Sequence, residues 1–195
     1  MSLLALRLEG LGLSCHRFGY SSVRQSVAAN ARALNEYALA LNADQLDFVG
    51  YSLGGLVVLR MLDEYGGLPP GRVVLLGSPV RGSAVASRMI AMKPARPLIG
   101  QARSALERGF SHAPIGRETG VIAGTSGVGL GRIVQDLEPP HDGTIQVAET
   151  RLEGAADSLT LPVSHTGLVL ARPVAEAVAR FLMTGTFEAG LRFAD

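Results

Sequence analysis

One short segment combines a candidate nucleophile with the local sequence that such a residue needs. It reads Asp47-Phe48-Val49-Gly50-Tyr51-Ser52-Leu53-Gly54-Gly55, an apolar stretch that runs into G-x-S-x-G and then into a helical stretch. In so tight a turn the serine backbone is strained and side chains two positions away on either side collide, which favours Gly50 and Gly54. The turn raises the Ser52 hydroxyl above the sheet edge. It also leaves the Leu53 amide at a helix N-terminus, where it can donate to an oxyanion. An ordinary tight turn between strand and helix remains the alternative.

A serine hydroxyl is a poor nucleophile at neutral pH, so this interpretation requires a histidine base and a carboxylate that orients it. Four histidines compete for the role of base. His165 follows the last predicted strand and precedes the final helix, at the end of the strands where α/β sites gather. His16 falls inside a predicted strand, His112 in an insertion and His141 in a loop, positions typical of core or surface residues. His165 is therefore the predicted base, with an ordinary loop residue as the alternative.

Two aspartates are candidates for the carboxylate that orients the histidine base. Asp142 lies in a turn between the last two predicted strands, and Gly143 after it suits a tight turn that points the carboxyl group back toward the site. Asp136 is the rival. A solvated Asp-Gly turn without a catalytic role also stays open, and Asp142 is the predicted acid.

These segments resemble the α/β-hydrolases, and among them the bacterial lipases and lipase-like esterases. The resemblance runs over most of the chain and rests on Gly50-Tyr51-Ser52-Leu53-Gly54-Gly55, Leu76-Gly77-Ser78-Pro79-Val80-Arg81-Gly82-Ser83, Asp142-Gly143-Thr144 and Ser164-His165-Thr166-Gly167. The family usually has histidine where Val80 stands. The resemblance implies Ser52 as nucleophile, Asp142 as acid and His165 as base, in the chain order typical of the family. It implies no particular substrate.

The elements that must position these side chains alternate between strand length and helical period, which indicates the α/β class. A capping box from Ser22 to Gln25 is predicted to open a helix that ends near Asn42. Further helices are predicted at Leu53–Tyr65 and Pro173–Met183. The predicted strands are Ser14–Tyr20, Gln45–Val49, Arg72–Leu76, Thr119–Ala123 and Ser158–Val163. We expect one domain over 1–195 with a mostly parallel sheet of about five to six strands flanked by helices.

The resemblance also points to a missing element. The family pattern begins with an apolar strand that ends in His-Gly, and its loop supplies a second oxyanion-hole amide. Residues 1–8 instead look like the helix that follows this strand. The missing strand normally lies between those that correspond to Ser14–Tyr20 and Gln45–Val49. Three compensations are open: the flanking strands pair directly, a neighbouring chain fills the gap, or the natural chain begins upstream. Losing one oxyanion donor lowers turnover by about 10² to 10³, so we expect a chain without this donor to be weakly active or inactive.

Residues 81–117 break the alternation and look like a helical insertion. They carry seven basic residues against one acidic, interspersed with Met89, Ile90, Met92, Leu98 and Ile99. The insertion is therefore a candidate cap or lid over Ser52 that contacts an anionic or lipid surface. A solvated helical cap without a membrane role is the alternative.

Composition and motifs exclude several other classes. The chain has 195 residues, 47% hydrophobic and 18% charged, with a net charge of +1, which argues against disorder and against nucleic-acid binding. Cys15 has no partner for a disulfide and is expected to be a small buried residue. Met92 before Lys93 excludes a P-loop, and the glycines at 124–131 miss the dinucleotide pattern. No metal, cofactor, signal peptide or membrane span is predicted, and we expect a cytoplasmic protein.

The sequence thus predicts a cofactor-free serine hydrolase that cleaves small-molecule or lipid carboxylic esters through an acyl-enzyme. One alternative is a non-catalytic hydrolase-like module that binds a partner or membrane surface through residues 81–117. Another is a thioesterase or acyltransferase that uses the same Ser52, Asp142 and His165. The sequence does not indicate the oligomeric state.

Overall fold

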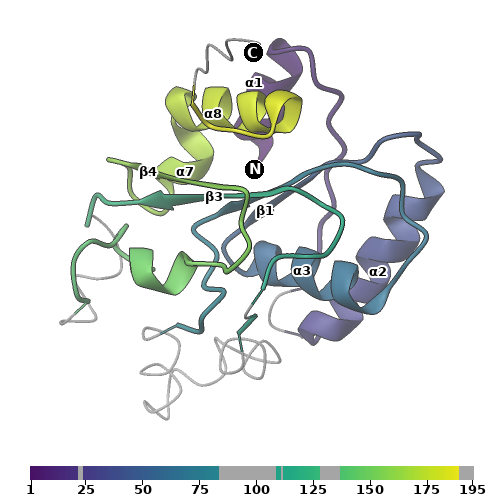
Figure 1. The fold of residues 1–195 in the computed structure, drawn as a ribbon, viewed down its shortest axis with the longest axis horizontal. Coiled ribbons are helices and arrows are strands. Elements are labelled where there is room, and N and C mark those ends of the chain that lie inside the picture. The colour runs from purple at the N-terminus through teal and green to yellow at the C-terminus, as the bar shows by residue number, and fades with distance from the viewer. Residues whose placement is uncertain (22–23, 84–108, 111, 128–136, 189–195) are drawn as a thin grey trace, which may run out of the picture.

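The structure is a computed structural model that describes residues 1–195 except 22–23, 84–108, 111, 128–136 and 189–195 (Figure 1). Its elements, in chain order, are α1 (Ser2–Gly10), α2 (Val27–Ala40), β1 (Phe48–Tyr51), α3 (Leu53–Glu64), β2 (Val73–Leu76), β3 (Thr119–Gly124), η4 (Val147–Thr150), β4 (Asp157–Leu161), α7 (Gly167–Leu170) and α8 (Arg172–Thr184).

The strands form one parallel sheet in the order β1-β2-β3-β4. Phe48 lies opposite Val73, Val73 opposite Thr119, and Gly120 opposite Asp157. Because all strands run the same way, their carboxyl ends meet at one edge of the sheet, where β1 leads into Ser52. The α/β class and the parallel sheet flanked by helices are confirmed. The described residues contain four strands, against an expected five to six.

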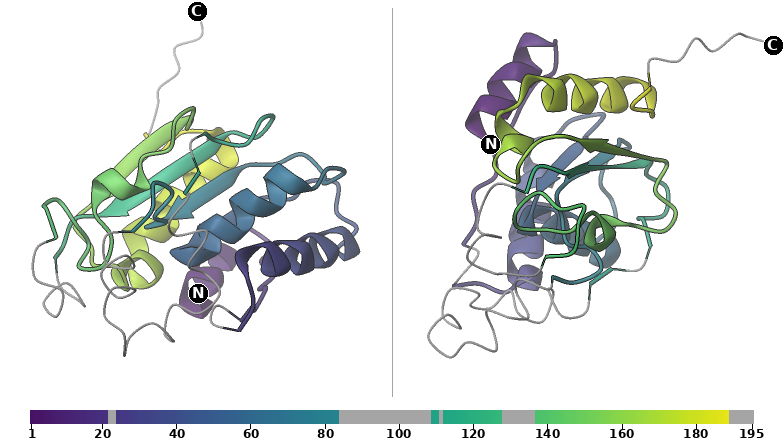
Figure 2. Two further views of the ribbon diagram at one scale, coloured as in Figure 1. Left: turned by 90° about the horizontal axis from the view of Figure 1, so that it is seen from below. Right: turned by 90° about the vertical axis from the view of Figure 1, so that its left-hand side faces the viewer.

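Helices cover both faces of the sheet (Figures 1 and 2). Helices α2 and α3 pack on each other and cover one face, and α1, α7 and α8 cover the other. All four residues of β2, Val-Val-Leu-Leu, are buried between these layers, which explains why its sequence is continuously apolar. The edge strand β4 instead alternates between partly buried and exposed residues. The sheet is therefore a rigid platform that holds the loops at its carboxyl edge.

The predicted strand at Ser14–Tyr20 is wrong. These residues belong to no strand, and no described residue forms a backbone hydrogen bond with them. A strand needs a neighbour for its backbone donors and acceptors, but β1 and residues 14–18 line a cavity instead of pairing. Direct pairing of the two flanking segments, one of the three compensations considered, is therefore not what the structure adopts.

The predicted start of α2 is also corrected. The capping residue is Ser26, whose side chain accepts a hydrogen bond from the Ala29 amide at 3.1 Å, and the helix begins at Val27. Ser22, the predicted cap, lies outside the described residues. Helix α2 buries Ala31 and Leu34 in the core.

Most of the predicted cap falls outside the described residues, because 84–108 are not described. Two of its arginines are described, and both donate hydrogen bonds to main-chain carbonyls of segments that lie outside the strands. The Arg117 guanidinium donates to the Leu46 carbonyl at 2.7 Å and lies over the Phe48 ring, 5.2 Å from its centroid. Arg81 donates to the Arg151 carbonyl at 2.9 Å. Among the helices of the described part of the chain, none is long and apolar enough to cross a bilayer.

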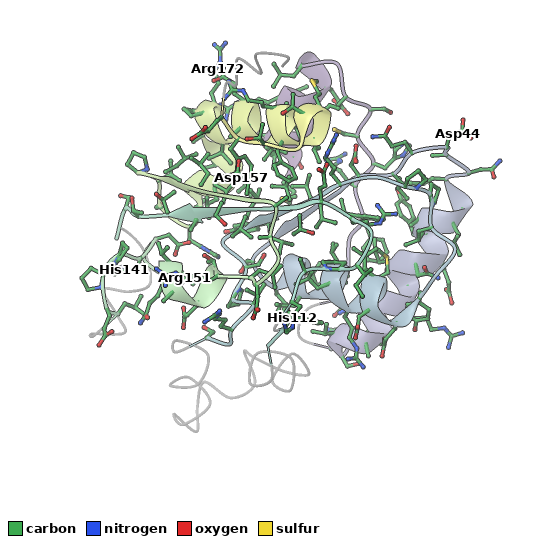
Figure 3. All side chains as sticks on the ribbon, in the orientation of Figure 1. Asp44, His112, His141, Arg151, Asp157 and Arg172 are labelled. Carbon is green, nitrogen blue, oxygen red and sulfur yellow. The ribbon has the colours of Figure 1, made fainter. Side chains whose placement is uncertain are left out.

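A carboxylate at the start of β4 fixes the chain that follows α8. Asp157 accepts hydrogen bonds from the Thr186 hydroxyl at 2.9 Å, the Phe187 amide at 2.7 Å and the Ser158 amide at 2.7 Å. Figure 3 places it between β4 and α8. Partial burial raises the pKa of this carboxyl group, but the three hydrogen bonds outweigh burial, so the pKa of Asp157 lies below its ordinary value.

We expect Asp157→Asn to lower the free energy of unfolding by about 1 to 2 kcal/mol near pH 7, because a neutral amide accepts these bonds less strongly. A depressed native pKa stabilises the fold above the unfolded pKa of about 3.9, and this stabilisation is lost as pH falls through the native pKa. The difference between the two proteins should therefore shrink between about pH 7 and about pH 2. Urea unfolding at both pH values measures it.

The matched control is Asp44→Asn. Asp44 is exposed, and within the described structure it accepts no hydrogen bond. Its substitution should leave stability unchanged at both pH values. An equal loss of unfolding free energy for Asp157→Asn at both pH values would contradict the lowered pKa of Asp157.

Candidate active site

Ser52 occupies a strained turn between β1 and α3. Its φ is 53°, in the left-handed region that non-glycine residues rarely adopt. Its amide donates to the Leu76 carbonyl of β2 at 2.8 Å, which fixes the turn to the sheet. The side chain makes no capping bond to α3 and is free to point elsewhere.

The steric basis of this turn differs in part from the expectation. A Cβ at Gly50 would lie 2.5 Å from the Gly55 Cα, so glycine is required there as predicted. At Gly54 the nearest atom is the Tyr20 hydroxyl at 3.4 Å, which is ordinary contact, so no collision occurs. The second tight position is Gly55, where a Cβ would lie 2.0 Å from the Ser78 hydroxyl oxygen.

The structure brings the Ser52, His165 and Asp142 side chains together. The His165 Nε2 lies 3.0 Å from the Ser52 Oγ, and the His165 Nδ1 lies 2.6 Å from the Asp142 Oδ2. The Asp142 side chain is 1% exposed and that of His165 is 13% exposed. The three groups therefore form a chain of hydrogen bonds that leads from a buried carboxyl group to a partly accessible hydroxyl.

The loop around Asp142 holds the carboxyl group in place. Its Oδ1 accepts hydrogen bonds from the Thr144 amide at 2.9 Å and the Ile145 amide at 2.7 Å, which leaves Oδ2 for His165. The main chain adds a second link, because the His165 amide donates to the Asp142 carbonyl oxygen at 2.8 Å. Two separate contacts thus fix the imidazole relative to this loop.

Two glycines at strand ends make room for this pair. A Cβ at Gly77, just after β2, would lie 3.1 Å from both the Asp142 Oδ2 and the His165 Nδ1, and 2.6 Å from the Leu168 Cδ1. A Cβ at Gly124, the last residue of β3, would lie 2.8 Å from the Asp142 Cβ. Neither glycine was predicted to have a role. The available signal was glycine directly after an apolar strand, at the edge where the site residues were expected.

Tyr51 was also missed, although it precedes the predicted nucleophile. Its ring lies against the His165 ring with a centroid distance of 5.0 Å. Burial, and then the Asp142 charge, raise the pKa of its hydroxyl to about 12, so it stays neutral at ordinary pH. The apolar body of Tyr51 therefore limits water around the imidazole without adding charge.

The Leu53 amide is positioned as expected. Leu53 is the first residue of α3, and its N–H has no acceptor in the described part of the chain. An unpaired amide at a helix N-terminus next to Ser52 can donate to a developing negative charge.

The other candidates lie apart from this cluster. His16 is exposed and His112 lies 3.5 Å from Glu153 in an exposed pair. The His141 Nδ1 accepts from the Gly143 amide at 3.1 Å. Figure 3 shows His112 and His141 at the periphery. Asp136 lies outside the described residues.

Cys15 is partly buried rather than buried, and it lies in an unpaired segment rather than a strand. Burial, and then the Glu9 charge, raise the pKa of its thiol. The thiol is therefore less ionised than a free cysteine, which reduces its reactivity.

Comparison with solved structures identifies the fold. Phospholipase PlaB from Legionella pneumophila matches with a TM-score of 0.71 and 18% identity over 93% of this chain and 56% of that chain. The mature lipase BlEst2 from Bacillus licheniformis gives 0.63 and 19% over 80% of this chain and 75% of that chain. The meta-cleavage product hydrolase CumD from Pseudomonas fluorescens gives 0.59 and 12% over 94% and 84%. The chain has the α/β-hydrolase fold, the class to which these lipase and hydrolase structures belong.

These similarities concern the fold alone, because the sequence identities are low. The chain spans 41% to 75% of the length of the BlEst2 and PlaB structures that it matches. No protein-family model matches the chain, and no curated protein matches it. The particular reaction must therefore be argued from the site.

Gly77→Ala should separate His165 from Asp142, since φ at Gly77 is 53° and the added Cβ presses on both groups. A strong hydrogen bond to carboxylate moves the imidazole Nδ1 proton resonance far downfield. We expect this resonance in the unmodified protein and its loss in Gly77→Ala and Asp142→Asn, as measured by proton NMR.

Gly67→Ala is the matched control, because Gly67 has φ of 81° and no atom within 4 Å of an added Cβ. It carries a similar backbone strain far from the site, so the resonance should persist. A downfield resonance that survives in Gly77→Ala would show that the pair tolerates the added methyl group.

Proposed function

We propose that the protein is a serine hydrolase that cleaves carboxylic esters through an acyl-enzyme. The observation that carries this proposal is the hydrogen-bond chain from the Asp142 carboxylate through His165 to the Ser52 hydroxyl, at 2.6 and 3.0 Å. Geometry of this kind activates serine in unrelated hydrolases, because each of the three groups has one task.

In the first half-reaction the Ser52 Oγ attacks the ester carbonyl carbon as its proton passes to the His165 Nε2. The Asp142 carboxylate stabilises the imidazolium and keeps its Nδ1 proton directed inward. Collapse of the tetrahedral intermediate breaks the bond to the alkoxide, which takes the proton from Nε2 and leaves as alcohol. Water then attacks the acyl-enzyme with His165 as base, which releases the carboxylic acid and restores Ser52.

The negative oxygen of both intermediates needs donors, and the Leu53 amide is one. It points from the N-terminus of α3, so the helix dipole adds to its effect. One donor is assigned among the described residues, and a missing second donor lowers turnover by about 10² to 10³.

Small-molecule and lipid esters are the proposed substrates. PlaB is a phospholipase and BlEst2 is a lipase, and the likeness of this fold to theirs supports an ester of this kind. A thioester donor or an alcohol acceptor would use the same three residues. The non-catalytic, membrane-binding alternative depends on residues 81–117, of which 84–108 and 111 lie outside the described part. A peripheral membrane contact and a cytoplasmic location stay predictions.

Ser52→Ala should abolish covalent labelling by a fluorophosphonate and lower hydrolysis of a short p-nitrophenyl ester by about 10³-fold or more. The reason is that the probe needs the activated Oγ rather than a binding pocket alone. Asp142→Asn should lower the labelling rate by about 10³ to 10⁴ through the wrong imidazole tautomer. Mass spectrometry of the labelled peptide identifies the modified residue.

Ser158→Ala is the matched control, since Ser158 is an exposed serine on β4, away from the site. Its labelling and hydrolysis should equal those of the unmodified protein. Labelling that persists in Ser52→Ala would remove the proposed mechanism.

A further inference from the structure

The His165 imidazole is fixed at two points by contacts that do not involve the nucleophile. Its main chain is held on both sides, because its amide donates to the Asp142 carbonyl at 2.8 Å and its carbonyl accepts from the Leu168 amide at 3.3 Å. Its Nδ1 lies 2.6 Å from the Asp142 Oδ2. The fixed Cβ and Nδ1 define a line, and the Nε2 lies off that line. The ring can therefore still tilt about this line, and such a tilt moves the Nε2 across the site.

Two contacts among the described residues oppose this tilt. The Ser52 Oγ lies 3.0 Å from the Nε2 and is its one hydrogen-bond partner in the described part of the chain. The Tyr51 ring lies against the imidazole, with a centroid distance of 5.0 Å and an interplanar angle of 36°. Aromatic rings at this separation attract each other. A tilt away from Tyr51 loses this contact and a tilt toward it produces a collision, so the contact restricts the imidazole in both directions.

The main chain of Tyr51 is held by the sheet. Tyr51 is the last residue of β1, and its Cα lies opposite that of Leu76 in the buried strand β2. The Ser52 amide that follows it donates to the Leu76 carbonyl at 2.8 Å. The main-chain groups of Tyr51 itself, like those of Val49, are directed to the other edge of β1, where no described residue bonds to them. The ring is thus positioned through its neighbour in the chain and through β2.

An acyl-enzyme keeps only one of the two contacts that oppose the tilt. In the free protein the Ser52 hydroxyl donates its proton toward the Nε2. In the acyl-enzyme the Ser52 Oγ carries the acyl group and has no proton, so it can no longer donate to the Nε2. The attacking water takes that place, but water is not attached to the protein and does not fix the ring. The Tyr51 ring then remains as the contact that opposes the tilt within the described structure.

We propose that Tyr51 is a positioning residue for deacylation, the second half of the proposed reaction, on which this inference rests. Its ring holds the imidazole so that the Nε2 accepts a proton from water while the water oxygen bonds to the acyl carbon. The intermediate then breaks its bond to the Ser52 Oγ, which takes the proton back from the Nε2. A displacement of about 1 Å costs about 10²-fold in rate, so loss of the ring slows this step more than acylation.

Pre-steady-state hydrolysis of p-nitrophenyl acetate separates the two steps. The burst of p-nitrophenolate measures acylation, and the steady rate that follows it measures deacylation. In Tyr51→Ala we expect an acylation rate within about threefold of that of the unmodified protein. We expect a deacylation rate lower by about tenfold or more. Intact-protein mass spectrometry after rapid quenching should show that the acetyl-enzyme accumulates in this variant.

Two further variants separate the ring from other effects of the substitution. Tyr51→Phe keeps the ring and loses the hydroxyl, so it should restore deacylation to within about threefold of the unmodified rate. Tyr65→Ala is the matched control, because Tyr65 is also half-buried but caps the C-terminal end of α3, at the opposite end from Ser52. It should leave both rates unchanged. If Tyr51→Ala fails to fold, Tyr51→Leu keeps an apolar side chain without the flat ring and carries the same expectation.

Hydroxylamine distinguishes a misplaced base from a general loosening of the site. It is a stronger nucleophile than water and attacks esters with less help from a base, which forms a hydroxamic acid and frees Ser52. Because Tyr51→Ala lacks a well-positioned base, hydroxylamine should accelerate its turnover by a larger factor than that of the unmodified protein. The downfield Nδ1 proton resonance should persist in the variant, since Asp142 and the main chain of His165 are untouched.

A selective loss of deacylation that Tyr51→Phe restores supports the proposal. It is overturned if both rates fall equally, if neither falls, or if Tyr51→Phe is as slow as Tyr51→Ala. Equal acceleration of both proteins by hydroxylamine also overturns it. Fluorophosphonate labelling of the unmodified protein separates this proposal from the serine hydrolase proposal. If Ser52 is labelled and any of these outcomes occurs, only the role of Tyr51 fails, whereas absence of labelling removes both.

Discussion

Close packing between the ends of the strands and the loops that follow them is the constraint on which the site depends. The Asp142 carboxyl group reaches His165 only because Gly77 and Gly124 leave the space above β2 and β3 empty. The turn at Ser52 depends on a glycine in the same way, because the main chain of α3 lies directly against Gly50 and leaves no space for a side chain there. These are contacts between backbone and site atoms. A single methyl group there displaces the reacting atoms, whereas the same group on the outer face of α2 displaces only water.

The parallel sheet makes this packing possible. Because β1, β2 and β3 end at the same edge, the turn, the Gly77 segment and the loop at Asp142 are neighbours in space, although they span more than ninety residues, from Ser52 to Asp142. The strain at Ser52 is stabilised by this arrangement, since the Ser52 amide is anchored to Leu76. Strain of about 1 to 3 kcal/mol persists only where the surroundings fix it, and buried β2 provides such surroundings.

The sequence predicted those parts that depend on local pattern. Strand length, helical period and the G-x-S-x-G turn depend on nearby residues, and the structure has β1, α3, β2, β3, β4 and α8 close to the predicted ranges. The errors concern non-local requirements. Ser14–Tyr20 has a strand-like sequence, but pairing depends on a neighbour that the pattern does not encode. Gly54 and Gly55 look alike in the sequence, and only the position of Ser78, two residues after β2, shows which of them needs to be glycine.

The unpaired edge of β1 connects stability with the site. Val49 and Tyr51, whose main-chain groups lack partners, lie directly before Ser52, and Tyr51 packs on the His165 ring. An unsatisfied main-chain group in an apolar site costs about 1 to 3 kcal/mol, so the outer edge of β1 is less stabilised than the edge that pairs with β2. Motion of β1 would move the Tyr51 ring and the Ser52 turn together, because they are consecutive in the chain.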